Sequence, residues 1–203
     1  MKSNDFDKIA FVYDRLAGLV FGKSIVDSQK VFFDKIPAEA RILIMGGGSG
    51  RILQELFSAN PKIEVCYIDA SAKMISHTKH RMRNDMRIEF IVGTENDIPD
   101  RSFDVIVTNF YLDLFKAESL LSVLRKLKNV MGPNSLWIVT DFTDKKWWHR
   151  LMIKVMYIFF RVTARIEASK LPDWNGALQK IGGRKNGSKF FFRDFIEATM
   201  FQF

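Results

Sequence analysis

The chain has 203 residues, 47% hydrophobic and 27% charged, which is typical of one folded domain and excludes a disordered or fibrous protein. Its single cysteine, Cys66, excludes an intrachain disulfide, and the lack of a signal-like N-terminus or long uncharged apolar run predicts a cytoplasmic protein without a transmembrane segment. The formal net charge is +8, and residues 145–193 hold twelve basic residues against two acidic ones, which indicates an acidic partner or a solvated basic face.

The N-terminal part, 1–40, is predicted to be a helical cap that precedes the main domain, 41–203. Apolar residues recur at helical spacing over 6–16, and a second helix is predicted over 24–35, before a proline. We expect both parts to belong to one globular unit.

A glycine-rich stretch follows the first apolar run of the main domain. The run 42–45 predicts a strand buried on both faces, and 51–57 predicts a helix because its apolar residues recur at helical spacing. The glycines between them are Gly46, Gly47, Gly48 and Gly50. They allow a sharp turn and a close approach of the backbone to a ligand, and the free amides of the following helix favour an anionic group. The stretch therefore predicts a site for a nucleotide-type cofactor.

The spacing of these glycines distinguishes between cofactors. A dinucleotide fingerprint, G-x-G-x-x-G, needs a third glycine at the position of Arg51, whereas Gly50 completes G-x-G-x-G. The next predicted strand, 63–69, ends in Asp69, whose carboxylate can accept both hydroxyls of a ribose. These features resemble the class I S-adenosylmethionine-dependent methyltransferases, and are similar to the small-molecule and quinone-biosynthesis types. The resemblance implies S-adenosylmethionine as the cofactor and Asp69 as its ribose-binding acid.

Strands and helices are predicted to alternate over about a hundred residues, which indicates an α/β fold with a parallel sheet. The resemblance implies a Rossmann-like, doubly wound sheet of seven strands, mostly parallel with an antiparallel C-terminal hairpin, and helices on both faces. Further strands are predicted at 87–92, 102–109, 135–141, 189–192 and 195–203. Further helices are predicted at 70–81, capped by Ser71, at 120–127, stopped by Gly132-Pro133, and from 172 to the glycines at 182–183.

The resemblance also assigns residues around the adenine of the cofactor. Ala70 and Met74, after the ribose-binding acid, would flank the ring. Thr94 stands where the family carries an acid on the adenine amino group, and Glu95 and Asp97 are alternatives for that role.

The predicted strand 102–109 carries the Phe-Asp-Val-Ile run that is most recognisable in the family. It delivers Asn109 and Phe110 to the sheet edge where ligands bind in open α/β folds, and both are candidate cofactor contacts. The sequence after Asn109 lacks the prolines of the Asn-Pro-Pro-Tyr motif, so an exocyclic adenine amine is a disfavoured target. Ile44 replaces the acid that the family carries two residues before the first glycine.

A sulfonium methyl group is already activated, so its transfer chiefly needs alignment and a desolvated nucleophile. Where the acceptor needs a base, three residues are candidates. These are Asp113, His149 and Tyr13. No metal is expected, because His77 and His80 share a helix face without a supporting carboxylate or cysteine.

The segment 145–165 combines tryptophans, a wide apolar stripe and spaced cations. It suits a helix packed on the sheet, a lid over an apolar substrate or a helix in peripheral membrane contact. With the aromatic N-terminal segment, it favours a small, apolar or aromatic acceptor as the partner. Two alternatives stay open: an RNA methyltransferase that uses the basic C-terminal region, and a catalytically inactive binding module, given Ile44.

Overall fold

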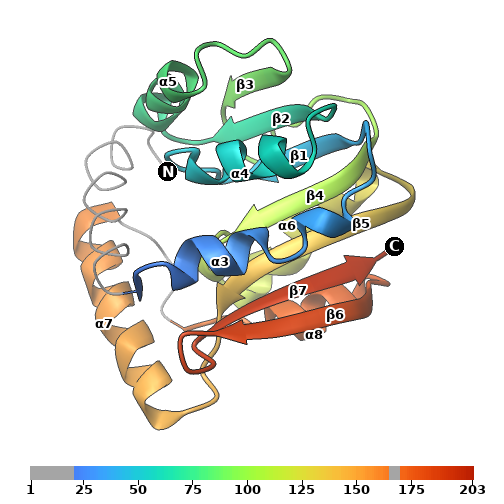
Figure 1. Cartoon of the computed structure of the whole chain (residues 1–203). Coiled ribbons are helices and arrows are strands. Elements are labelled where there is room, and N and C mark those ends of the chain that lie inside the picture. Colours follow the sequence, from blue (N-terminus) through green and yellow to red (C-terminus); the bar gives the residue numbers. More distant parts are fainter. Residues whose placement is uncertain (1–20, 165–169) are drawn as a thin grey trace.

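The computed structural model describes residues 21–164 and 170–203 (Figure 1). They form one seven-stranded sheet with the order β3-β2-β1-β4-β5-β7-β6. Neighbouring strands from β3 to β5 run parallel, whereas β7 runs antiparallel to both β5 and β6. The strands are β1 Arg41–Met45, β2 Glu64–Asp69, β3 Ile88–Val92, β4 Phe103–Asn109, β5 Met131–Phe142, β6 Arg184–Phe191 and β7 Ile196–Gln202. The predicted α/β class and the antiparallel C-terminal hairpin are confirmed.

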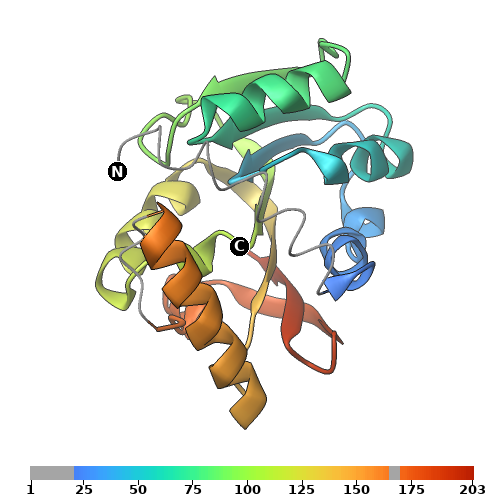
Figure 2. The same ribbon diagram turned by 90° about the vertical axis from the view of Figure 1, so that its left-hand side faces the viewer.

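Helices cover both faces of the sheet. Helices α3 and α4 lie in front of it in Figure 1, whereas α6 and α8 lie behind it. Figure 2 looks along the sheet from the side at which the parallel strands end, and α7 lies in the foreground. The helices are α3 Ser24–Lys30, α4 Arg51–Ala59, α5 Ala72–Arg81, α6 Ala117–Asn129, α7 Trp147–Ala164 and α8 Trp174–Lys180, with short 3-10 helices η1 Phe33–Lys35 and η2 Leu112–Leu114.

The central strand β1 is buried on both faces, as its continuous apolar run predicts. Ile42 and Ile44 pack into the cluster that contains the apolar side of α4. Leu43 and Met45 pack into the opposite cluster, which contains the apolar side of α6. Successive side chains of a strand point to opposite faces, so one short run anchors both helical layers.

Two predicted helix starts are confirmed by their capping bonds. Oγ of Ser71 accepts the N–H of Met74 at 3.1 Å at the start of α5. Asp173 Oδ1 accepts the N–H of Gly176 at 2.9 Å at the start of α8. Each side chain satisfies an amide that the first helical turn leaves without a partner, which fixes where the helix begins.

The predicted stop of a helix at Gly132-Pro133 is wrong. Helix α6 ends at Asn129, and both residues lie inside β5. The pairing between β4 and β5 shifts its register here, and Pro133 has no partner in the register of either neighbouring strand. A proline is tolerated in this position because its missing N–H interrupts no ladder bond.

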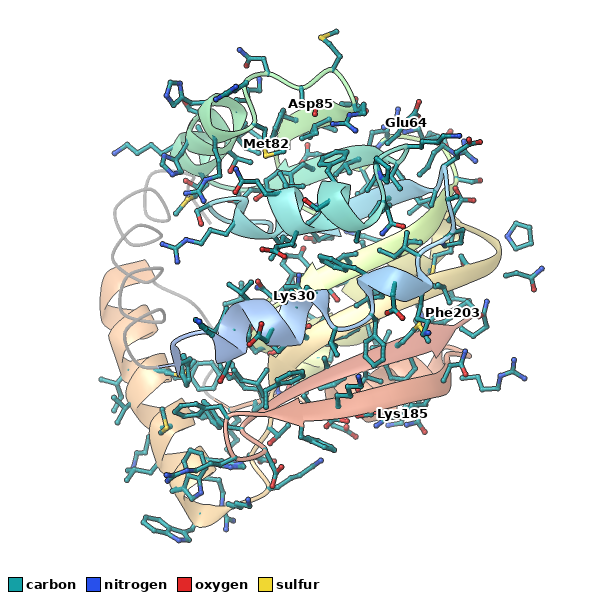
Figure 3. The ribbon with its side chains drawn as sticks, viewed as in Figure 1. Lys30, Glu64, Met82, Asp85, Lys185 and Phe203 are labelled. Atoms are coloured by element: carbon teal, nitrogen blue, oxygen red, sulfur yellow. The ribbon has the colours of Figure 1, made fainter. Side chains whose placement is uncertain are left out.

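Helix α3 connects the sheet to α4. The predicted helix over 24–35 divides into α3 and η1. Thr140 Oγ1 of β5 donates to the carbonyl of Ser28 at 3.3 Å. Lys30, labelled in Figure 3, forms an ion pair with Glu55 of α4 at 3.7 Å. Helix α3 is thus held against the face that carries α4.

The first predicted helix, over 6–16, and the candidate Tyr13 lie outside the described residues. The division into a cap, 1–40, and a main domain, 41–203, stays a prediction. Within the described parts of the chain, no helix is both long and apolar enough to cross a bilayer.

Candidate active site

The glycine turn lies between the carboxyl end of β1 and α4. The N–H of Gly46 donates to the Ile68 carbonyl of β2 at 2.9 Å, which ties the turn to the neighbouring strand. Gly47 admits no side chain, because a Cβ there would lie 2.1 Å from Cζ of the fully buried Tyr67. Gly48 has a φ of +61°, and a Cβ there would meet no atom within 4 Å. The turn is therefore packed on one side and open to a ligand on the other.

Side chains of β2 and α5 hold the backbone of Gly48. Asp69 Oδ2 accepts its N–H at 2.8 Å, while Tyr67 Oη and Thr78 Oγ1 donate to its carbonyl at 2.9 and 3.1 Å. Asp69 Oδ1 accepts the N–H of Ser71 at 2.8 Å. The structure thus brings the glycines and Asp69 together, and it adds Tyr67 and Thr78, which the sequence analysis missed.

Two more predicted cofactor contacts follow Asp69. Ala70 is half-buried and Met74 is buried, and both lie where β2 passes into α5. Ile44, at the position of the family's acid, is fully buried in the register between Tyr67 and Val107. Its side chain belongs to the apolar core, so no carboxylate takes its place there.

The three candidates for the contact with the adenine amino group lie in the loop after β3, and their side chains have different partners. The N–H and Oγ1 of Thr94 donate to Asp97 Oδ2 at 2.8 and 3.3 Å, so these two side chains stabilise the loop itself. Glu95 Oε2 instead lies 3.5 Å from Tyr111 Oη, and its Oε1 lies 3.8 Å from Lys126 Nζ. Of the three, Glu95 points to the loop that follows β4.

The loop after β4 directs its two neighbouring aromatic residues to different places, and the cofactor contact of Phe110 stays a prediction. Phe110 has a φ of +51°, and its ring lies 4.8 Å from the ring of Phe142, on the side of α7. Tyr111 packs on the turn instead, since a Cβ on Gly46 would lie 2.6 Å from its Cδ2. Burial, and next to it the charge of Glu95, raise the pKa of Tyr111. The sequence carries no signal for the contact of Tyr111 with the turn, which depends on the unusual backbone angle at Phe110.

Buried polar atoms without partners gather at the end of β4. Asn109 is 7% exposed, and neither its Oδ1 nor its Nδ2 has a hydrogen-bond partner among the described residues. Asp113 in η2 is 3% exposed, and its Oδ1 lacks a partner there as well. A buried polar atom left without a hydrogen bond costs about 1–3 kcal/mol, which makes these atoms candidates for contact with a ligand.

Asp141, at the end of β5, holds Asp113 in place. Its Oδ2 accepts the N–H groups of Leu112 and Asp113, each at 3.2 Å, and its Oδ1 accepts the N–H of Phe142 at 2.8 Å. Burial raises the pKa of Asp113 to about 7. Burial and the repulsion from Asp113 raise the pKa of Asp141 well above its ordinary range, which the backbone amides oppose. Burial therefore favours the neutral form of both carboxyl groups, and their mutual repulsion opposes the ionisation of both at once.

The histidines lie away from these groups. His149, in the first turn of α7, is fully buried, and burial lowers its pKa. Its Nδ1 accepts the N–H of Lys146 at 3.4 Å, which leaves Nε2 to donate to the Arg193 carbonyl at 3.3 Å. This ring joins α7 to the turn between β6 and β7. His77 is exposed beside Arg81, and the described residues contain no group of His, Cys, Asp or Glu that could hold a metal.

Comparisons with known proteins agree with this arrangement. Residues 42–134 match a family model described as a methyltransferase domain. A demethylmenaquinone methyltransferase of Thermotoga maritima is 30% identical over 141 residues, which are 67% of this chain and 59% of that protein. The chain thus spans less than two thirds of the length of this relative.

Solved structures share the fold. A putative methyltransferase of Haloferax volcanii, in complex with the activator Trm112, has a TM-score of 0.75 at 13% identity, with 100% of this chain and 97% of that chain covered. The N-methyltransferase NodS of Bradyrhizobium japonicum, in complex with S-adenosyl-L-homocysteine, has a TM-score of 0.68 at 11% identity, with 86% and 84% covered. At these identities the likeness concerns the fold alone.

Proposed function

We propose that this chain is a class I S-adenosylmethionine-dependent methyltransferase that acts on a small, apolar or aromatic acceptor. The match of residues 42–134 to a methyltransferase domain, the relative from Thermotoga maritima and the shared fold of solved methyltransferases support this family. The observation that carries the proposal is the pairing of two features at one sheet edge. The glycine turn and Asp69 lie at the ends of β1 and β2. Beside them, after β4, lie the buried polar atoms of Asn109 and Asp113 that have no hydrogen-bond partner among the described residues.

The residues at the turn fit the cofactor. The open side of Gly48 leaves room for a ligand, and Asp69 lies directly against it at the place of the ribose-binding acid. Met74 and Ala70 would flank the adenine, and the direction of Glu95 makes it our choice for the amino group. When bound, S-adenosylmethionine supplies an activated sulfonium methyl group.

Asp113 is the base that we propose for the acceptor. Its Oδ1 is buried and has no partner among the described residues, so a hydroxyl of the acceptor can donate to it. A carboxyl group with a pKa of about 7 is ionised in a substantial fraction of molecules at neutral pH and can still take up a proton. Asp141 is a positioning residue, because it binds the backbone amide of Asp113 rather than the acceptor. His149 is less suited, since both ring nitrogens have partners within the fold.

The surroundings of Asp113 favour an apolar, aromatic acceptor with a hydroxyl group. Aromatic rings cluster where β4 and β5 end, close to α7; they are Phe21, Phe110, Phe142 and Phe195. The relative from Thermotoga maritima is named for a quinone substrate. A phenol or hydroquinone would place its ring among these side chains and its hydroxyl on Asp113, where loss of the proton activates either the oxygen or the ring carbon beside it.

Calorimetry with S-adenosylmethionine and S-adenosyl-L-homocysteine tests the cofactor first. Micromolar binding supports the proposal despite Ile44 and justifies a screen of phenols and hydroquinones with a labelled methyl group. No binding at millimolar ligand would refute it and would favour the inactive binding module.

Asp69→Ala should weaken the binding of S-adenosyl-L-homocysteine by about 1.5–3 kcal/mol, the scale of hydrogen bonds to a charged group. Asp104→Ala is the matched control, because Asp104 lies at the opposite end of the strands, where its Oδ2 accepts the N–H of Arg41 at 2.8 Å. Its affinity should equal that of the wild type. Equal affinities of Asp69→Ala and wild type, with both proteins folded by circular dichroism, would mean that the ribose lies elsewhere.

An RNA methyltransferase remains the second candidate, on the basic excess between 145 and 193. Part of that charge is neutralised within the fold, because Lys145 and Lys185 pair with Glu197, and Lys146 pairs with Asp194. RNA binding that weakens steeply with salt would favour this candidate, and its absence at low salt would remove it.

A further inference from the structure

Helix α7 carries apolar side chains on two sides. Its inward side packs on the ends of β5 and β7 through Ile153 and Tyr157, both of which are buried. Four large side chains point outward instead. Their exposed fractions are 72% for Trp147, 55% for Leu151, 60% for Val155 and 56% for Ile158. Packing in the core accounts for only one side of the helix.

The four outward side chains, Trp147, Leu151, Val155 and Ile158, form what we call the α7 stripe. They follow each other at intervals of four, four and three residues, and at 3.6 residues per turn they fall within an arc of about 80°. The exposed Arg150 and Lys154 lie along one edge of this arc. The helix contains no acidic residue. An apolar stripe edged by cations is typical of a helix that lies in a membrane interface.

The cations at the edge of the stripe differ from those just before the helix. Lys145 pairs with Glu197 at 3.3 Å, and Lys146 pairs with Asp194 at 2.7 Å. Within 21–164 and 170–203, neither Arg150 nor Lys154 has an ion-pair partner. The charge beside the stripe is therefore directed to the solvent and can meet an external anionic surface.

We propose that the α7 stripe docks on the surface of an anionic lipid bilayer. Burial of four large apolar side chains among the acyl chains supplies the attraction, and the headgroups neutralise Arg150 and Lys154. The helix lies on the bilayer and does not cross it, because no described helix meets the requirements of a membrane span.

A second copy of the chain fits this surface less well than lipid does. A two-fold dimer brings the same patch of both copies together. Arg150 and Lys154 of each copy would then face the same basic helix, which offers no carboxylate to pair with them. An anionic bilayer offers both the apolar depth and the opposite charge.

Co-sedimentation of the full chain with lipid vesicles tests the proposal. The wild type should sediment with vesicles of phosphatidylcholine and phosphatidylglycerol, less with phosphatidylcholine alone, and less again as salt is added. The double variant Leu151→Ser/Val155→Ser should lower the partition coefficient by at least about tenfold. Arg150→Gln/Lys154→Gln should lower only the preference for anionic lipid. Met86→Ser is the matched control, because Met86 is apolar and 96% exposed but lies in the loop before β3.

Three outcomes would overturn the proposal. In the first, the wild type does not sediment with anionic vesicles at low salt. In the second, Leu151→Ser/Val155→Ser binds the vesicles as well as the wild type does. In the third, the wild type forms a dimer without lipid, and this variant abolishes it. The last outcome, seen by sedimentation velocity, would assign the stripe to a second copy. Circular dichroism and thermal unfolding show whether each variant is folded. The α7 stripe lies on the outward side of the helix and contains none of the proposed cofactor or acceptor contacts, so these results are independent of the proposed activity.

Discussion

Asp113 makes the stability of the protein depend on pH in a direction opposite to that of most carboxyl groups. Burial raises its pKa from an ordinary 3.8 to about 7, so between these values the folded chain binds a proton that the unfolded chain releases. Stability that is present at low pH is then lost as the pH rises. From these two pKa values, the contribution of Asp113 to the free energy of unfolding falls by about 2 kcal/mol between about pH 5.5 and about pH 8.

The variant Asp113→Asn isolates this contribution, because an amide does not ionise in this range. Urea unfolding of the wild type and the variant, followed by fluorescence at several pH values, gives the difference in unfolding free energy. Contributions of groups that do not interact with Asp113, among them the buried His149 with its lowered pKa, cancel in this difference. Asp141 does not cancel, because the charge of Asp113 raises its pKa, so the difference reports on the pair of carboxyl groups. The wild type should lose about 2 kcal/mol relative to the variant across that interval. Asp100→Asn, at an exposed residue before β4, is the matched control for the exchange of a carboxylate for an amide.

A difference between the wild type and Asp113→Asn that stays constant with pH would refute this reasoning. It would mean that Asp113 is ionised throughout in the folded protein. The same variant addresses catalysis. Asp113→Asn should abolish methyl transfer and leave the binding of S-adenosyl-L-homocysteine unchanged, and the rate of the wild type should rise with pH through about 7.

Two further predictions concern the cofactor. Gly47→Ala should destabilise the fold by about 2 kcal/mol and weaken S-adenosyl-L-homocysteine binding, because the new Cβ displaces the buried Tyr67 from the Gly48 carbonyl. Gly132→Ala, whose Cβ would meet its nearest atom at 3.6 Å, is the control, and equal melting temperatures of both variants would contradict this account. Glu95→Ala should weaken the same binding, measured by calorimetry, more than Asp97→Ala does. The reverse order would assign the adenine contact to Asp97 and not to Glu95.

Local signals predicted much of this fold. The apolar run at β1 is long enough to pack on both helical layers, and Ser71 satisfies the first amides of its own helix. Each of these features is decided by residues close together in the chain. The positions of Gly48 and Asp69 were also predictable, since Gly48 lies in the turn after β1, Asp69 is the last residue of β2, and the ends of neighbouring parallel strands meet at one edge.

Other features depend on contacts between distant segments or on single backbone angles. Asp141 is visible in the sequence as an acid at a strand end, but its bonds to η2 come from two residues that lie 29 and 28 positions earlier. The contact of Tyr111 with the glycine turn depends on the left-handed φ of the residue before it, Phe110. Pro133 was predicted to stop a helix, because the sequence does not indicate the register shift that accommodates this proline in β5. Sequence spacing alone does not determine such features.

Helix α7 connects the two proposals through its two sides. On its inward side, Tyr157 Oη donates to the carbonyl of Asp113 at 2.9 Å, so this helix helps to position the proposed base. On its outward side, the α7 stripe would rest on lipid. An apolar acceptor partitions into a bilayer, and α7 would lie between that bilayer and the aromatic side chains on its inward side. A protein that methylates such an acceptor gains from having both functions on one helix, because docking then brings the site to its substrate.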